Sequence, residues 1–165
     1  NTVYNVQSAG GTKIAIGIRA ADRSGSTANV KNNIVAGLVS AASNGERAYE
    51  HGAANGGSGT LNEAYNLSDD TSATAYDASG TGSLIDKSLA EIDFVNTVAG
   101  SEDLHLDTDS VCREAGVDLG TTNGVNIDID QVDRDATGVT WDMGADQASV
   151  LGGSAGTAFI MFLDT

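Results

Sequence analysis

The chain has 165 residues with 23 acidic and 8 basic side chains, a formal net charge of −15. Nucleic acid is excluded as a partner because phosphate binding needs clustered Lys and Arg, and an anionic membrane surface would repel this chain. No apolar run approaches the roughly 20 residues that a membrane span requires. The length favours one domain, and the single cysteine, Cys112, excludes an internal disulfide framework.

The composition favours a β fold rich in turns. Gly accounts for 21 residues, Pro is absent, and most of the acidic residues are Asp, whose short side chain caps turns. The 40% hydrophobic content, which recurs in short β-type runs, argues against disorder. The chain opens within a strand pattern, and we expect further coils upstream in a longer product.

Short strands separated by polar loops are predicted for the first half of the chain. The predicted strands are residues 2–6, 13–19, 29–35, 38–39, 47–49 and 61–67. The predicted turns and loops are residues 8–12, 20–28, 52–60 and 68–82. In strand 13–19, alternation predicts Ile14, Ile16 and Ile18 facing inward, with Lys13, Ala15 and Gly17 facing outward.

An asparagine-centred repeat organises these strands. The stretch 29–35 (NVKNNIV) has weaker copies before it, at 4–6 (YNV), and after it, at 65–67 (YNL). Alignment on Asn5, Asn33 and Asn66 gives two similar steps of roughly 30 residues, the spacing of a stacked supersecondary unit. We therefore expect a right-handed parallel β-helix (solenoid) in which stacked asparagine amides form a ladder, with Asn33 inside and Ile34 and Val35 on opposite sheet faces.

Helix is expected at one place only. Residues 83–94 space Leu84, Ile85, Leu89 and Ile92 as one face of a short helix, and a turn is the alternative reading.

The second half carries an ordered series of motifs. They are DFVN at 93–96, EDLHL at 102–106, SVCREAG at 110–116, DID at 128–130 followed by Arg134, and WDMGAD at 141–146. Over residues 93–147 this series resembles the closing coils of right-handed parallel β-helix proteins of the pectate-lyase-like superfamily, found in secreted bacterial and phage-encoded proteins. Val111 departs from the usual Pro, Glu114 from the usual Asp, and residues 131–133 from the Gly-Asp-Pro turn.

The end of this series is expected to cap the stack. A last coil would expose unpaired strand edges, which invite association unless they are covered. We expect Trp141 and Met143 to lie over the open end, and Asp142 and Asp146 to accept hydrogen bonds from unpaired backbone N–H groups. The alternative is that Trp141 is only a large core residue.

Four features are candidates for chemical sites. Residues 128–135 carry four carboxylates, a composition that suits Ca²⁺, but they lack the features of an EF-hand loop, so a solvated acidic turn is the favoured reading. Adjacent residues on a strand point to opposite faces, which argues against Asp69 and Asp70 as a glycosidase pair. His51, placed in a loop, and His105, on a strand between Leu104 and Leu106, are interpreted as surface or core residues.

The resemblance also implies an enzymatic alternative. Polysaccharide lyases of the superfamily use a basic residue beside an acidic Ca²⁺ site, and none of the eight basic residues here sits in a recognisable lyase motif. We therefore assign no catalytic, cofactor or metal residues.

Residues 148–165 are predicted to form a second region, separate from the coils and cap of residues 1–147. A Gly-rich linker leads to the apolar strand 157–163 (TAFIMFL). A strand at a solenoid's rim can bury only one face, so we expect this one to dock between chains, in a homotrimer by preference or on a capsid or tail neighbour.

Three functions fit these features. The favoured one is a non-catalytic structural protein of an extracellular assembly, as virion capsid decoration, fibre or tailspike material. The alternatives are a polysaccharide lyase or glycosidase acting on a glycan, and a secreted bacterial adhesin or surface-layer module.

Overall fold

The computed structural model describes residues 1–9, 14–21, 25–40, 45–52, 59–69, 77–121, 125–137 and 140–148. This part of the chain is mostly β with very little helix, which confirms the predicted all-β class. It contains no helix that is long and apolar enough to cross a membrane. The predicted tail strand 157–163, Asp70 and most of the loops at 8–12 and 52–60 lie outside the described residues.

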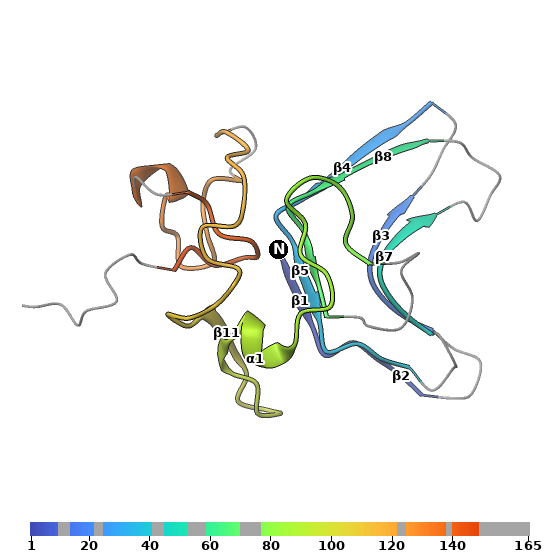
Figure 1. Ribbon diagram of the computed structural model, residues 1–165, viewed down its shortest axis with the longest axis horizontal. Coiled ribbons are helices and arrows are strands. Elements are labelled where there is room, and N and C mark those ends of the chain that lie inside the picture. Colours follow the sequence, from blue (N-terminus) through green and yellow to red (C-terminus); the bar gives the residue numbers. More distant parts are fainter. Residues whose placement is uncertain are drawn as a thin grey trace, which may run out of the picture.

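Successive passes of the chain run side by side in parallel register (Figure 1). The pairs are β1 (Thr2–Tyr4) with β5 (Ile34–Ala36), β2 (Gln7–Ser8) with β6 (Val39–Ser40), β3 (Ala15–Ala21) with β7 (Glu46–Gly52), and β4 (Thr27–Lys31) with β8 (Thr60–Ala64). β9 (Leu67–Ser68) then joins β5. Thr2 pairs with Ile34, Ala15 with Glu46 and Thr27 with Thr60, so the offset between passes stays nearly constant along the chain.

The strand β5 is buried on both of its faces. Ile34 and Val35 are each fully inaccessible to solvent but belong to different hydrophobic clusters. Val35 packs with Ala48 and Tyr49 on the side of β7. Ile34 packs with Met143 and other residues of the second half of the chain. The predicted alternation of Ile34 and Val35 about the sheet is therefore confirmed.

The predicted single strands 29–35 and 61–67 are each divided by a corner, so this prediction was wrong. Asn32 and Tyr65 adopt left-handed backbone conformations, with φ of 55° and 53°, and separate β4 from β5 and β8 from β9. A β-strand cannot continue through such a residue, and asparagine tolerates this conformation better than most residues. Hydrophobic alternation did not show the corner because apolar residues lie on both sides of it.

The asparagine ladder exists, but its first member is Asn1 and not the predicted Asn5. Asn33 Nδ2 lies 2.9 Å from Asn66 Oδ1, and Asn1 Nδ2 lies 3.0 Å from Asn33 Oδ1. Asn33 is buried, as predicted, and Asn66 is buried too. Asn5 is exposed, and its carboxamide oxygen accepts a hydrogen bond from Gln7. The alignment failed because Thr2 pairs with Ile34, which brings Asn1 rather than Asn5 level with Asn33.

The predicted orientation of strand 13–19 was also wrong. Ala15 is buried, whereas Ile14 and Ile16 are only half-buried. A Cβ at Gly17 would lie 2.3 Å from Val35 Cγ1 and 2.8 Å from the carbonyl oxygen of Ala48. At Ala15 and Gly17 β3 therefore approaches its neighbours too closely for isoleucine, whereas Ile18 packs half-buried against the cluster of Val35 and Ala48.

Only one turn of helix forms in the predicted helical stretch 83–94. α1 (Leu89–Ile92) begins at Ser88, whose hydroxyl accepts the Glu91 N–H while the Glu91 carboxylate accepts the Ser88 N–H. Ile92 is fully buried, but Ile85 and Leu89 are exposed, so the predicted apolar face is not formed. Leu84 instead makes a parallel bridge to Leu67 and continues the stack.

The described residues of the range 89–148, called the closing segment here, cover one side of the β1–β5–β9 sheet (Figure 1). The segment contains α1, the antiparallel pair β10 (Phe94–Asn96) and β11 (Asp103–Leu106), and the 3-10 helix η2 (Arg134–Thr137). Its core residues Ile92, Cys112 and Met143 pack in one cluster with Ile34 of β5 and Leu67 of β9.

The predicted cap over the open end of the stack was therefore misplaced. Met143 contributes to the lateral face, next to Gly144, whose N–H donates to the Asn32 carbonyl. Trp141 is buried within the closing segment itself, which agrees with its alternative reading as a large core residue. The sheet face of Ile34 and Leu67 is apolar, so packing the closing segment over it removes that apolar surface from water.

Candidate functional site

Two buried carboxylates hold the closing segment in shape. Asp142 accepts the N–H groups of Glu114 and Ala148 at 2.6 and 2.7 Å, and Asp146 accepts the Leu106 N–H at 2.9 Å. These contacts confirm the prediction that Asp142 and Asp146 serve unpaired backbone N–H groups. Burial raises the pKa of both carboxyl groups, and the N–H donors partly offset that rise.

Arg134 lies at the centre of this arrangement. Its guanidinium donates to the carbonyl oxygens of Asp142 and Gly144 at 3.2 and 3.0 Å and lies 5.8 Å from the centre of the Trp141 ring. Burial lowers the pKa of Arg134, and the carboxylates of Asp128, Asp142 and Asp146 act in the opposite direction. A buried cation surrounded in this way organises the fold and has little freedom to act on a substrate.

Asn32 attaches the closing segment to the strands. Its side chain donates to the Val117 carbonyl at 2.6 Å and accepts the Val117 N–H at 2.9 Å, so the carboxamide pairs with Val117 as a backbone peptide would. The Ala145 N–H donates to Thr2 Oγ1 at 3.0 Å. The corner at Asn32 and the start of β1 at Thr2 thus fix the position of the segment.

An open groove of about 820 Å³ lies where the closing segment meets the β4 corner. Asn29, Val30 and Asn32 contribute to its lining from the strands, and Ile127 and Ile129 contribute from the closing segment. The two isoleucines are substantially exposed. The groove therefore combines an apolar wall with carboxamide groups.

Two charged side chains of the groove, Asp128 and Arg134, are already engaged in hydrogen bonds, and Lys31 lines it as well. Asp128 Oδ1 accepts the N–H groups of Asp130 and Val132, and Asp128 Oδ2 accepts the Gln147 N–H. Arg134, which also lines the groove, is bound to carbonyl oxygens as described above. Proton transfer to a substrate needs a group within reach and free to exchange its proton, and neither side chain meets that condition.

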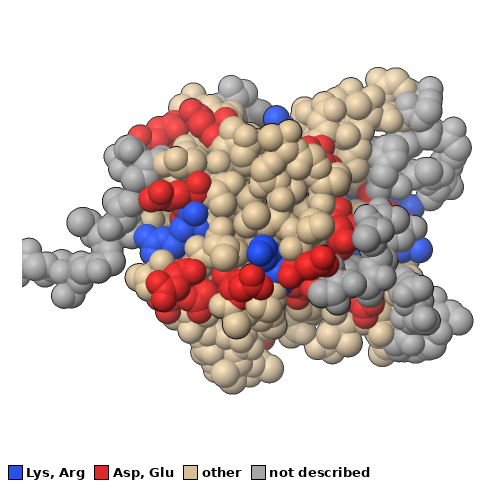
Figure 2. All heavy atoms as spheres, in the orientation of Figure 1, with Lys and Arg blue, Asp and Glu red and all other residues tan. Residues whose placement is uncertain are grey.

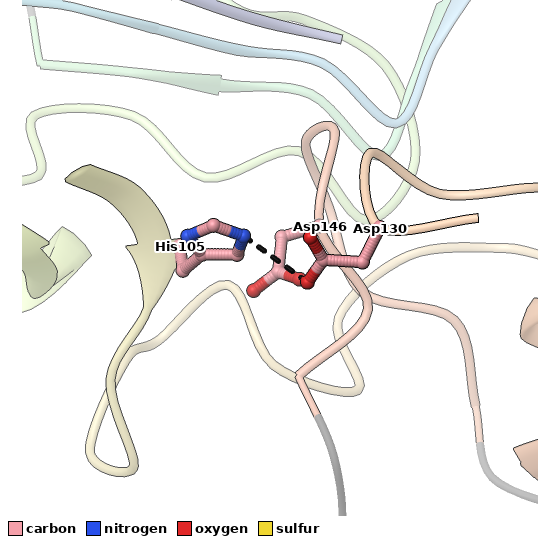
Figure 3. Close-up of side chains that lie close together, drawn as sticks. All are labelled: His105, Asp130 and Asp146. Carbon is pink, nitrogen blue, oxygen red and sulfur yellow. Dashed lines mark ion pairs between the residues drawn. The ribbon is translucent and has the colours of Figure 1, made fainter. Parts of the chain in front are cut away.

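A second polar cluster includes Asp130, from the same turn as Asp128. His105 of β11 has Asp103 at Nδ1 and Asp130 at Nε2, the latter with its Oδ2 atom 3.1 Å away. Asp146 is close by, and candidate ligand atoms of His105, Asp130 and Asp146 all lie within 4.8 Å of one another. In Figure 3 the imidazole edge points toward two carboxylates that come from different loops. Hydrogen bonding to Asp103 is the main reason that the pKa of His105 is raised.

The acidic stretch 128–135 is a turn closed by a bridge between Ile127 and Asp133. Its carboxylates mostly accept internal hydrogen bonds: Asp133 from Asn126 and the Asp135 N–H, and Asp135 from Trp141 Nε1. Asp128 is buried, which the reading as a fully solvated turn did not anticipate.

The other predicted candidates are dispersed. Asp69 accepts the Gly37 N–H at 2.7 Å. The backbone of His51 lies in β7 and pairs with Ala20, so its predicted place in a loop was wrong. His105 lies on a strand between Leu104 and Leu106, as predicted.

Sequence reasoning considered His105 and Asp130 separately and missed that they meet. His105, Asp130 and Asp146 belong to three separate motifs of the second half of the chain, and no local spacing in the sequence connects them. One feature of the sequence points to part of this cluster. His105 and Asp103 lie two residues apart on a strand, which places both side chains on one face.

Comparison with protein-family models, with curated proteins and with solved structures finds no match for this chain.

Proposed function

We propose that this chain forms coils of a right-handed parallel β-helix and serves as a non-catalytic structural protein of an extracellular assembly, such as a phage or virus particle. The observation that carries the proposal is the parallel pairing of successive strands, from β1 with β5 to β4 with β8, at a nearly constant offset along the chain. Such an offset is what a stack of coils requires.

The open edges of the strands support a role in assembly. β1, β2, β3 and β4 each pair on one edge only among the described residues. Unpaired backbone N–H and C=O groups on a strand edge are a template for another strand. A further coil or a neighbouring chain can add to this edge in the same parallel register.

The groove supports binding over catalysis. Its lining is mostly apolar or carboxamide, and two of its charged side chains, Asp128 and Arg134, are occupied by hydrogen bonds within the protein, while Lys31 adds a further charge. The engagement of Asp128 and Arg134 argues against either of them as the free acid or base that a polysaccharide lyase or a glycosidase needs beside its substrate.

The surface charge is compatible with a particle exposed to solvent. Figure 2 shows several groups of acidic side chains and few basic ones on the face drawn. A net charge of −15 keeps such a protein soluble and opposes non-specific binding to nucleic acid.

We expect the contact with a partner to lie in the apolar tail, residues 157–163. The sequence of residues 157–163 has five successive large apolar side chains. At roughly 25 cal/mol per Å² of apolar area, leaving two or three of them in water would forgo several kcal/mol. We expect a homotrimer or a complex with a capsid or tail protein, and deletion of residues 156–165 should reduce the mass measured by light scattering. An unchanged mass would limit the tail to a contact within one chain.

The place where the protein is found in and around producing cells distinguishes the three candidate functions. We would raise antibodies against the chain and apply immunogold electron microscopy to the medium and the surface of producing cells. Gold on regular particles is expected. Gold confined to the cell envelope would favour the adhesin, and release of oligosaccharides from a polysaccharide panel would favour the enzyme.

A further inference from the structure

We propose that His105, Asp130 and Asp146 bind a divalent transition-metal ion of the zinc class, which ties three parts of the closing segment together. Candidate ligand atoms of the three residues all lie within 4.8 Å of one another. Zinc–ligand bonds of about 2.0–2.1 Å in a tetrahedral site place ligand atoms about 3.4 Å apart. The site therefore needs a modest closure, which the exposed Asp130 side chain can supply from its turn.

The Nε2 atom of His105 is the first sign of a missing ligand. This atom is buried and forms an ion pair with Asp130 Oδ2 at 3.1 Å, but it has no hydrogen bond of regular geometry. The oxygen therefore lies off the direction along which the ring nitrogen would donate. Buried nitrogen atoms without a regular hydrogen bond are rare in folded proteins. A cation on the axis of Nε2 would bind this nitrogen and would also contact the Asp130 oxygen.

A carboxylate holds the other nitrogen of the imidazole, Nδ1, as is usual for histidines that bind a metal. Asp103 Oδ1 contacts His105 Nδ1 and also accepts the His105 N–H at 3.2 Å. A carboxylate in this position holds the proton on Nδ1, which leaves the Nε2 lone pair for a metal and orients the ring. Asp103 is thus a positioning residue for the proposed site.

Asp146 is fixed in a similar way. It is only 5% exposed, and its Oδ2 atom accepts the Leu106 N–H at 2.9 Å. The residue next to His105 on β11 therefore anchors the third ligand. The positions of His105 and Asp146 are linked through the backbone before any ion binds.

The ligand types select the class of ion. One imidazole and two carboxylates suit Zn²⁺ and related first-row ions, whereas Ca²⁺ and Mg²⁺ prefer oxygen ligands alone. The site differs from the Ca²⁺ site considered for residues 128–135, since Asp128, Asp133 and Asp135 take no part in it. Binding would join β11, the turn that carries Asp130 and the end of the closing segment, so it would stabilise the folded chain.

Isothermal titration of the full chain with Zn²⁺ tests the site, in excess Mg²⁺ to suppress non-specific attraction to a chain of net charge −15. We expect one saturable site. Asp130→Asn should weaken binding at least about tenfold, and Asp103→Asn should weaken it by about 10–100-fold, the usual effect of losing an orienting partner. His105→Ala should abolish binding.

Two matched controls give the result its specificity. His51→Ala removes the other histidine of the chain, and Asp109→Asn removes an exposed carboxylate from the same region. Both should bind Zn²⁺ within about twofold of the wild type, because neither residue belongs to the proposed site. Circular dichroism of each metal-free variant checks its fold, and the exposed Asp130 makes Asp130→Asn the decisive variant if His105→Ala is unstable.

The melting temperature supplies an independent measure. Zn²⁺ should raise it in the wild type and both controls but not in His105→Ala. The absence of saturable binding, or equal Zn²⁺ affinity in the wild type and Asp130→Asn, would overturn the proposal.

Discussion

Asn33 Nδ2 donates to Asn66 Oδ1 across 2.9 Å, and the backbone N–H of Asn33 donates to the same oxygen at 3.1 Å. Asn66 in turn donates to the Val30 carbonyl at 2.7 Å. Both side chains are buried at equivalent corners of successive passes of the chain. One carboxamide oxygen therefore satisfies two buried donors where the backbone turns and the strand ladder is interrupted.

Removal of this acceptor should be costly. Asn66→Ala leaves the Asn33 N–H without its acceptor and removes one of the two hydrogen bonds that Asn33 Nδ2 donates, the other going to the Lys31 carbonyl, and we expect a loss of about 2–3 kcal/mol in the free energy of unfolding. Urea denaturation measures the change. Asn62→Ala is the control, because it removes an exposed carboxamide contact to Asn29 and should cost less than about 0.5 kcal/mol. Equal losses in the two variants would contradict a special role for the buried pair.

Gly17→Ala should destabilise the contact between β3 and β5. The new methyl group would lie 2.3 Å from Val35 Cγ1, and such overpacking costs about 1–3 kcal/mol. A double-mutant cycle with Val35→Ala tests the cause, since removal of the Val35 methyl groups relieves the closest contact. The double variant should lose less stability than the sum of the single variants. Additive losses would mean that Val35 is not the obstacle.

Cys112 should be inert in the folded protein. It is fully buried between the closing segment and the sheet, and burial raises the pKa of its thiol to about 12. We expect it to react with a disulfide reagent at pH 8 slower than in urea by on the order of 10³-fold, through rare opening of the structure.

The variant Met143→Ala locates this opening. Met143 packs in the same cluster as Cys112, whereas Val35 packs in the other cluster. If the closing segment opens by itself, Met143→Ala should accelerate the reaction more than Val35→Ala does at equal loss of stability. The same acceleration in both would indicate that the thiol reacts only after global unfolding.

The lowered pKa of Glu91 predicts that the stability of the fold depends on pH through the start of α1. Hydrogen bonds from the Ser88 N–H and hydroxyl, and then from Lys87, lower the pKa of Glu91 from 4.5 to about 2. A lowered carboxyl pKa stabilises the fold above pH 4.5, and this contribution is lost as pH falls through about 2. Carboxyl NMR titration should give a midpoint near 2 that Ser88→Ala moves upward. An unchanged midpoint in that variant would exclude the capping contact as a cause.

The local pattern of residues by itself determined the all-β class, most of the short strands and the burial of Asn33. These features depend on side-chain period and on a carboxamide's need for partners, and both are properties of a few neighbouring residues. The same pattern predicted that Asp142 and Asp146 accept backbone N–H groups. It misplaced the first ladder residue because Asn1 and Asn5 flank the same short strand, and only the pairing of Thr2 with Ile34 selects Asn1.

Tertiary structure alone decided where the closing segment lies and which polar residues meet. Alternation marks residues as apolar but does not report the space available, so Gly17 and Ala15 could not be recognised as the inner face of β3. Nor could sequence show that Met143 covers Ile34, since both are merely apolar. His105, Asp130 and Asp146 come together because β11, the acidic turn and the last described residues pack against one another. Such contacts depend on the free energy of packing distant surfaces, which no short stretch of sequence encodes.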